Sequence, residues 1–229
     1  MAAACGGDSS SSPAKDELRT AVERTEATGS YRFEVLIEPD DGLGVVEAGE
    51  IDIVNGLGSS LVTSGGVSTP RFSDRGADYV LSESPSGKLW VRYDHSLDSV
   101  SRSVGAIAAA LVGGVERGEP QLVDGVTLVA YIATLPGGDG PAADVIRTGP
   151  ITFWVAPDGL VARLTYEVFQ SNGDGSSITT QVTLRYWDFG AVFEITLPLA
   201  EDVLSPEQFE EIFSAAAAGA KISSPAVGR

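Results

Sequence analysis

The stretch that decides the fold is Ser30-Tyr31-Arg32-Phe33-Glu34-Val35-Leu36-Ile37-Glu38. Apolar side chains stand at every second position from Tyr31 to Ile37, and most positions between them are charged. Successive side chains of a β-strand point to opposite faces, so this period of two predicts a strand with one buried face. The same period recurs along the chain between turns such as Asp40-Asp41-Gly42, and it predicts about ten strands in antiparallel order.

Three segments with helical spacing flank or interrupt these strands. Ser12-Pro13 provides an N-cap and a proline at the first helical position, and it predicts a helix over residues 14–27. Ser205-Pro206-Glu207-Gln208 is a capping-box start, and it predicts a helix to about residue 218. A middle helix is predicted where apolar residues recur at spacings of four, three, four and four: Val100, Val104, Ile107, Leu111 and Val115.

The order of these elements predicts the fold class. The chain shows no strand–helix–strand alternation and no clear repeat, so we expect an α+β fold in one domain, residues 14–219, with a loose tail at 220–229. Val126–Leu135 is apolar on both faces and needs cover on both, and the middle helix is the expected cover for one. Val192–Leu197 is a candidate for the last strand.

Composition excludes several classes of partner. The net charge is −17, from 15 basic and 32 acidic residues, and this field repels a nucleic-acid backbone and anionic lipid head groups. Cys5 and His95 are the single residues of their types, so we expect no intrachain disulfide, no cysteine-based zinc site and no histidine cluster. No cofactor is expected.

The N-terminal residues predict a lipid anchor. Cys5 follows three alanines and precedes a Gly/Ser-rich run, a pattern that looks like the end of a bacterial lipoprotein signal followed by a tether over residues 1–13. On this interpretation Cys5 carries the lipid and the domain is extracytoplasmic. A basic region and an apolar region would then precede it in a longer precursor. The alternative is that Cys5 is an ordinary residue of a disordered terminus.

Further along the chain, several segments resemble LolA-like bacterial lipoproteins, in particular the LppX/LprG branch. The likeness covers residues 15–200 and rests on the order of these motifs, which are Thr28-Gly29-Ser30-Tyr31-Arg32-Phe33, Gly49-Glu50-Ile51-Asp52, Ala77-Asp78-Tyr79-Val80, Leu89-Trp90-Val91, Val123-Asp124-Gly125-Val126 with Tyr131, Phe153-Trp154-Val155 and Asp158-Gly159-Leu160-Val161-Ala162-Arg163-Leu164. The resemblance implies a single antiparallel half-barrel sheet whose concave side is closed by helices. It also implies a cavity for the acyl chains of a lipid or glycolipid, and lipid transport across the cell envelope. The acidic C-terminal helix and the Ala-rich middle helix depart from the family pattern.

The candidate cavity is an apolar constellation. Phe33, Val35, Ile51 and Ile53 face one way on neighbouring strands, and the middle helix could close over them. The complete set of cavity candidates is Phe33, Val35, Ile51, Ile53, Val104, Ile107, Ala108, Leu111, Phe153 and Leu164. Alanine and glycine in the middle helix fill little volume and would leave room for a ligand. The alternative is a filled core, as in any sheet covered by a helix.

No enzymatic constellation can be assembled from the sequence, so we do not expect an enzyme. Asp94-His95-Ser96 has the residue types of a serine triad, but adjacent residues cannot converge on one another as a triad requires. Asp40-Asp41 and Glu201-Asp202 fit solvated turns, and Asn172-Gly173-Asp174-Gly175 fits a hairpin turn.

Two hypotheses for the function remain. The first is a monomeric, membrane-anchored lipid-binding lipoprotein. The second is an interaction or sensor domain of the same fold that binds an envelope protein.

Overall fold

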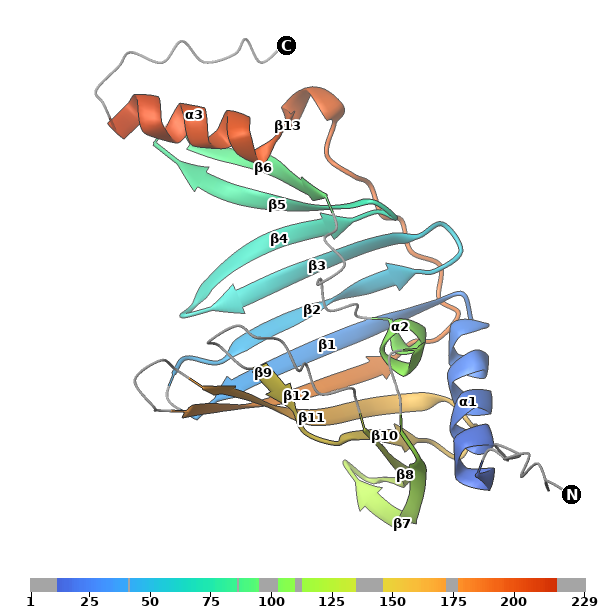
Figure 1. Cartoon of the computed structure of the whole chain (residues 1–229). Helices are drawn as coiled ribbons and strands as arrows, with labels where there is room; N and C mark the ends of the chain where they lie inside the picture. The colour runs from blue at the N-terminus through green and yellow to red at the C-terminus, as the bar shows by residue number, and fades with distance from the viewer. Residues whose placement is uncertain are drawn as a thin grey trace, which may run out of the picture.

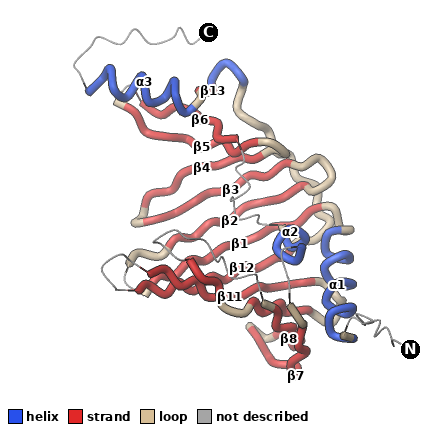
Figure 2. Tube along the Cα trace, viewed as in Figure 1, coloured by secondary structure: helices blue, strands red, loops and turns tan. Residues whose placement is uncertain are grey.

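The computed structural model describes residues 12–40, 42–85, 87–94, 103–109, 113–134, 146–171 and 177–217. In this part of the chain a single 13-stranded sheet is accompanied by three α-helices, which makes an α+β fold (Figures 1 and 2). The strands are β1 (Ser30–Pro39), β2 (Val45–Asp52), β3 (Leu57–Ser64), β4 (Val67–Ser73), β5 (Ala77–Ser84), β6 (Gly87–Asp94), β7 (Val115–Val123), β8 (Val126–Ala133), β9 (Ile146–Thr148), β10 (Ile151–Val155), β11 (Val161–Ser171), β12 (Ser177–Trp187) and β13 (Val203–Leu204).

The sheet is open and almost entirely antiparallel. Its strand order is β13-β6-β5-β4-β3-β2-β1-β12-β11-β10-β8-β7, and β9 pairs with β11 off this path. β13 pairs with β6 in parallel. The expectation of about ten strands was too low, because short β9 and β13 carry too few residues to show a period of two.

Helix α1 (Pro13–Glu26) confirms the first predicted helix to within one residue at each end. The Ser12 hydroxyl accepts a hydrogen bond from the Lys15 backbone N–H at 3.3 Å, and Pro13 takes the first helical position. Its buried face is Leu18, Ala21, Val22 and Thr25. The Thr25 hydroxyl accepts a hydrogen bond from Val161 N at 2.9 Å, which ties this face to β11.

The core lies between α1, α2 and one face of the central strands. We call this the inner face and define it by Phe33, Leu164 and Leu184. Leu184 pairs with Val35 of β1 on one side and with Leu164 of β11 on the other. Tyr31 and Tyr186 meet edge to face, with ring centroids 5.2 Å apart.

Helix α2 is described over Val104–Ala109, within the predicted middle helix, and the helix does not reach Val115. Val115, expected at the end of this helix, is the first residue of β7 and pairs with Ala133 of β8. Gly113-Gly114 precede it, and each glycine disfavours a helix interior by about 1 kcal/mol relative to alanine. Val100 and Leu111 lie outside the described residues.

The C-terminal elements also differ from expectation. Val192–Leu197, expected as the last strand, contains no strand residue, and the chain instead adds β13 to the edge of the sheet. Helix α3 (Pro206–Ala217) follows directly, so it contacts β13 and β6 at that edge and does not cover the inner face with α1 and α2 (Figure 1). The expectation that all helices cover the concave side is therefore wrong for α3. None of the described helices is long and apolar enough to cross a membrane.

Candidate functional site

The structure brings most of the cavity candidates into one cluster. Phe33, Val35, Val104, Ile107, Phe153 and Leu164 are all buried members of the same core. Ile51, Ile53 and Ala108 pack against it as partly buried residues. Leu111 and Cys5 lie outside the described residues. The side chains proposed to line a cavity under α2 therefore pack against one another as core.

Polar contacts hold α2 in its place. The Tyr31 hydroxyl accepts a hydrogen bond from Val104 N at 3.3 Å, and Glu26 Oε1 accepts one from Gly105 N at 2.9 Å. Burial, together with the negative charge of Glu26, raises the pKa of Tyr31 far above its usual value. A Cβ at Gly105 would lie 2.9 Å from Glu26 Cδ, so a larger residue here would displace the Glu26 carboxylate that accepts from Gly105 N.

Beside α2, on the side that faces α1, lies an apolar cleft of about 290 Å³. The walls come from small and aliphatic residues of both helices and of the start of β7, and three charged residues of α1 complete the lining. The lining residues are Leu18, Val22, Gly105, Ala108, Ala109, Gly113 and Val115, with Lys15, Arg19 and Glu23. The space exists because α2 presents alanine and glycine where a larger side chain would reach α1.

The α1 wall of this cleft is fixed from the other side. Glu17 accepts a hydrogen bond from the Tyr131 hydroxyl at 2.8 Å and forms an ion pair with Arg117 at 3.2 Å. Burial and the neighbouring Glu17 carboxylate raise the pKa of Tyr131. Arg19 pairs with Asp16 at 2.8 Å within α1. The cleft therefore lies between two helices that are each tied to the sheet.

Sequence reasoning missed the α1 half of the cleft. Leu18 and Val22 were recognisable as the apolar face of a helix, but nothing in the sequence placed α2 opposite them. The Ala- and Gly-rich sequence after Val104 predicted unfilled volume beside the middle helix, and residues of α2 do line the cleft. The cleft therefore lies beside α2 and not beneath it, where the sequence predicted a cavity. Among the cavity candidates that the structure describes, Ala108 lines this cleft.

The residues weighed as catalytic or metal-binding candidates do not come together in one site. Among the described residues, no group of three or more His, Cys, Asp or Glu side chains is placed to hold a metal ion. Asp40 Oδ1 accepts a hydrogen bond from Thr179 N at 3.3 Å, which is a structural role, and Glu201 and Asp202 are exposed in a short 3-10 helix. Asp41, His95-Ser96 and residues 172–175 lie outside the described residues.

Comparisons with known proteins find similarity in structure and none in sequence. No family model matches the chain, and no curated protein matches it. An uncharacterized conserved protein from Thermus thermophilus is similar in structure, with 7% identity and a TM-score of 0.44 over 83% of this chain and 98% of that one. A LolA superfamily protein from Nitrosomonas europaea is similar with 13% identity and a TM-score of 0.28, over 81% of this chain and 94% of that one.

Proposed function

We propose that this protein binds a lipid by burying one acyl chain in the cleft between α1 and α2, without catalysing a reaction. The observation that carries the proposal is the cleft itself, whose walls are aliphatic and whose volume is about 290 Å³. Burial of each methylene in such a site contributes about 0.8 kcal/mol. An apolar ligand also removes the penalty of leaving apolar space unfilled.

The size of the cleft narrows the class of ligand. Ligand pockets usually measure roughly 300–1,000 Å³, so this cleft is near the lower limit. It suits a single acyl chain better than the several chains of a glycolipid. We therefore propose a single-chain lipid, or one chain of a larger lipid, as the ligand, with the polar head group outside among Lys15, Arg19 and Glu23.

The position of the cleft supports a membrane-anchored carrier. Residues 6–12 separate Cys5 from the first helical residue, and these seven residues span at most about 25 Å when extended. Lys15 and Leu18, which line the cleft, belong to the first two turns of that helix. An acylated Cys5 on the extracytoplasmic face of a membrane would therefore hold the cleft near the bilayer, where a monomeric carrier would load and release lipid.

The test uses the full chain, stripped of lipid, with palmitate as the probe and native mass spectrometry as the readout. Ala108→Trp fills the cleft and should abolish binding, while Ala48→Trp on an exposed position of β2 should bind as the unsubstituted protein does. Circular dichroism confirms that both variants fold. Undiminished palmitate binding by Ala108→Trp, or no binding by the unsubstituted protein, would refute the proposal.

A second candidate is a domain that binds an envelope protein. The observation in its favour is the filled core beneath α2, where Phe33, Val104 and Leu164 pack together. In this version the protein recognises its partner through its surface and holds no lipid. Recovery of a stoichiometric protein partner from envelope extract, without co-purified lipid, would favour this candidate over the first.

A further inference from the structure

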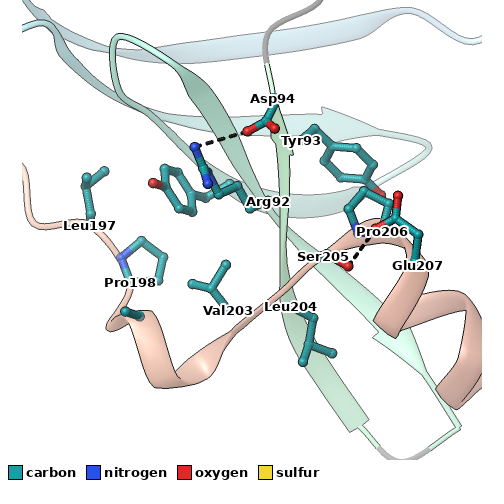
Figure 3. A pocket seen from close by; sticks show the side chains of 12 residues that line it. Arg92, Tyr93, Asp94, Leu197, Pro198, Val203, Leu204, Ser205, Pro206 and Glu207 are labelled. Carbon is teal, nitrogen blue, oxygen red and sulfur yellow. Dashed lines mark hydrogen bonds and ion pairs between the residues drawn. The ribbon is translucent and has the colours of Figure 1, made fainter.

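A second cavity, remote from the cleft, lies where the C-terminal segment crosses the end of the sheet. It is an open groove of about 660 Å³ between β5, β6 and residues 197–207 (Figure 3). We call it the C-terminal groove. It is lined by Tyr79, Arg92, Tyr93, Asp94, Leu197, Pro198, Ala200, Val203, Leu204, Ser205, Pro206 and Glu207. Its volume falls within the usual range for ligand pockets, roughly 300–1,000 Å³.

The strand side of the groove is polar and held in position. Arg92 forms an ion pair with Asp94 at 3.0 Å, and Figure 3 shows this pair at the strand wall. The Tyr79 hydroxyl donates to Asp74 Oδ2 at 2.8 Å, and Asp74 Oδ1 accepts from Ala77 N at 2.9 Å. The hydrogen bond to Asp74 holds the Tyr79 ring in place, and the ion pair directs the exposed Arg92 guanidinium toward Asp94.

The opposite side of the groove is aliphatic. Leu197, Pro198 and Val203 line it together, and the parallel pairing of Val203 with Trp90 fixes this wall against β6. Glu207 and Tyr93 line the groove from the other face of β6 (Figure 3). The face that carries Arg92 therefore offers apolar contact surface and hydrogen-bonding groups side by side.

Charge and polarity together select the class of ligand. An anion would face Asp94 in a chain of net charge −17, and a cation would face Arg92. An acyl chain would remove the Arg92–Asp94 ion pair from water, which is costly. An uncharged ligand rich in hydroxyls avoids all three penalties, because a hydroxyl both donates to a carboxylate and accepts from a guanidinium.

We propose that the C-terminal groove binds a neutral oligosaccharide. Sugar hydroxyls would donate to Asp94 and accept from Arg92. The C–H faces of the sugar rings would pack on the Tyr79 ring and on Pro198, which lie on the same side of β6 as Arg92. This site is separate from the lipid cleft and does not depend on it, so the protein could hold a glycan at one end while an acyl chain occupies the other.

The experiment titrates the isotope-labelled full chain separately with chitotriose, maltotriose, cellotriose and mannotriose, and follows backbone amide shifts by NMR. At least one sugar should shift amides of residues 92–94 and 197–207 in a saturable manner. Arg92→Met and Asp94→Ala should each weaken this binding about tenfold or more. Arg32→Met is the matched control, because Arg32 is equally exposed (46% against 48% for Arg92) and also ion-paired, and it should bind sugar normally.

Three outcomes would overturn the proposal. The first is that no sugar shifts these amides up to its solubility limit. The second is that the shifts fall elsewhere on the molecule. The third is that an oligolysine peptide saturates these amides and no sugar does, which would make the groove a site for cationic peptides. The Ala108→Trp variant should keep full sugar binding, so failure of the lipid proposal and failure of this one are distinguishable.

Discussion

At the scale of single residues, glycine determines how closely chain segments approach. Gly49 lies on the inner face of β2, opposite Phe33 of β1. A Cβ at this position would lie 2.7 Å from Ser60 Cβ and would also clash with the Ser59 carbonyl oxygen. Because one of these obstacles is backbone, the strands can relieve the clash only by separating. Gly49 therefore permits the tight pairing of β2 with β3.

We expect Gly49→Ala to destabilise the protein by about 2 kcal/mol or more, since overpacking against backbone costs roughly 1–3 kcal/mol. Urea denaturation followed by circular dichroism measures the change. Gly114→Ala is the control, because nothing lies within 4 Å of a Cβ there, and it should leave the midpoint unchanged. Equal stability of the two variants would contradict the role assigned to Gly49.

At the scale of elements, the open sheet protects its two edges in different ways. The edge strand β7 carries Pro120, a register shift between Arg117 and Pro120, and the charged residues Glu116, Arg117 and Glu119. These features discourage pairing with another chain. At the opposite edge, β6 reads Gly-Lys-Leu-Trp-Val-Arg-Tyr-Asp and is covered by β13 along Trp90 and Val91. β6 is thus shielded from pairing with another chain by β13, whereas the residues of β7 themselves disfavour such pairing.

Truncation after Pro198 should expose the edge of β6 and cause self-association, because an unpaired strand rich in aromatic and β-branched residues is a template for pairing. Size-exclusion chromatography with light scattering measures the change. Truncation after Ala217 retains β13 and α3 and should leave the elution profile unaltered. A monodisperse monomer from the shorter chain would show that β13 is dispensable.

At the scale of the whole molecule, the core is unevenly distributed. The buried cluster draws on α1, α2, β1, β7, β8 and β10–β12, and its members include no described residue of β3–β6. Ala77 and Val91 are the buried apolar residues of that half among those described. Stability should therefore be concentrated around Tyr31, Tyr186 and their neighbours.

The buried tyrosines make this half of the molecule sensitive to alkali. Burial raises the pKa of Tyr31, Tyr166 and Tyr186 above the usual value near 10. The unfolded chain loses these protons first, so stability is complete below pH 10 and falls as pH rises toward the folded-state pKa, by up to about 1.4 kcal/mol per tyrosine and pH unit.

We expect alkaline unfolding above pH 10 in which tyrosinate absorbance and loss of circular dichroism change together. Tyr186→Phe should make stability fall less steeply with pH, because it removes one of these buried phenols. Ionisation of every tyrosine before the protein unfolds would contradict the assignment of these three as buried neutral phenols.

Local sequence determined the identity of most elements of this protein. The alternation from Tyr31 to Ile37, the Ser12-Pro13 cap and the capping box at Ser205 are interactions between near neighbours, so periodicity and capping chemistry predict them. Tertiary structure alone decided that Val115 pairs with Ala133 at the start of β7, that β13 joins β6 in parallel, and that Ala108 faces α1 across a cleft. A repeating apolar pattern specifies which side of an element is buried, but it does not specify which distant segment will cover that side. The cleft and the C-terminal groove are both built from segments far apart in the chain, and for that reason neither could be predicted from one sequence.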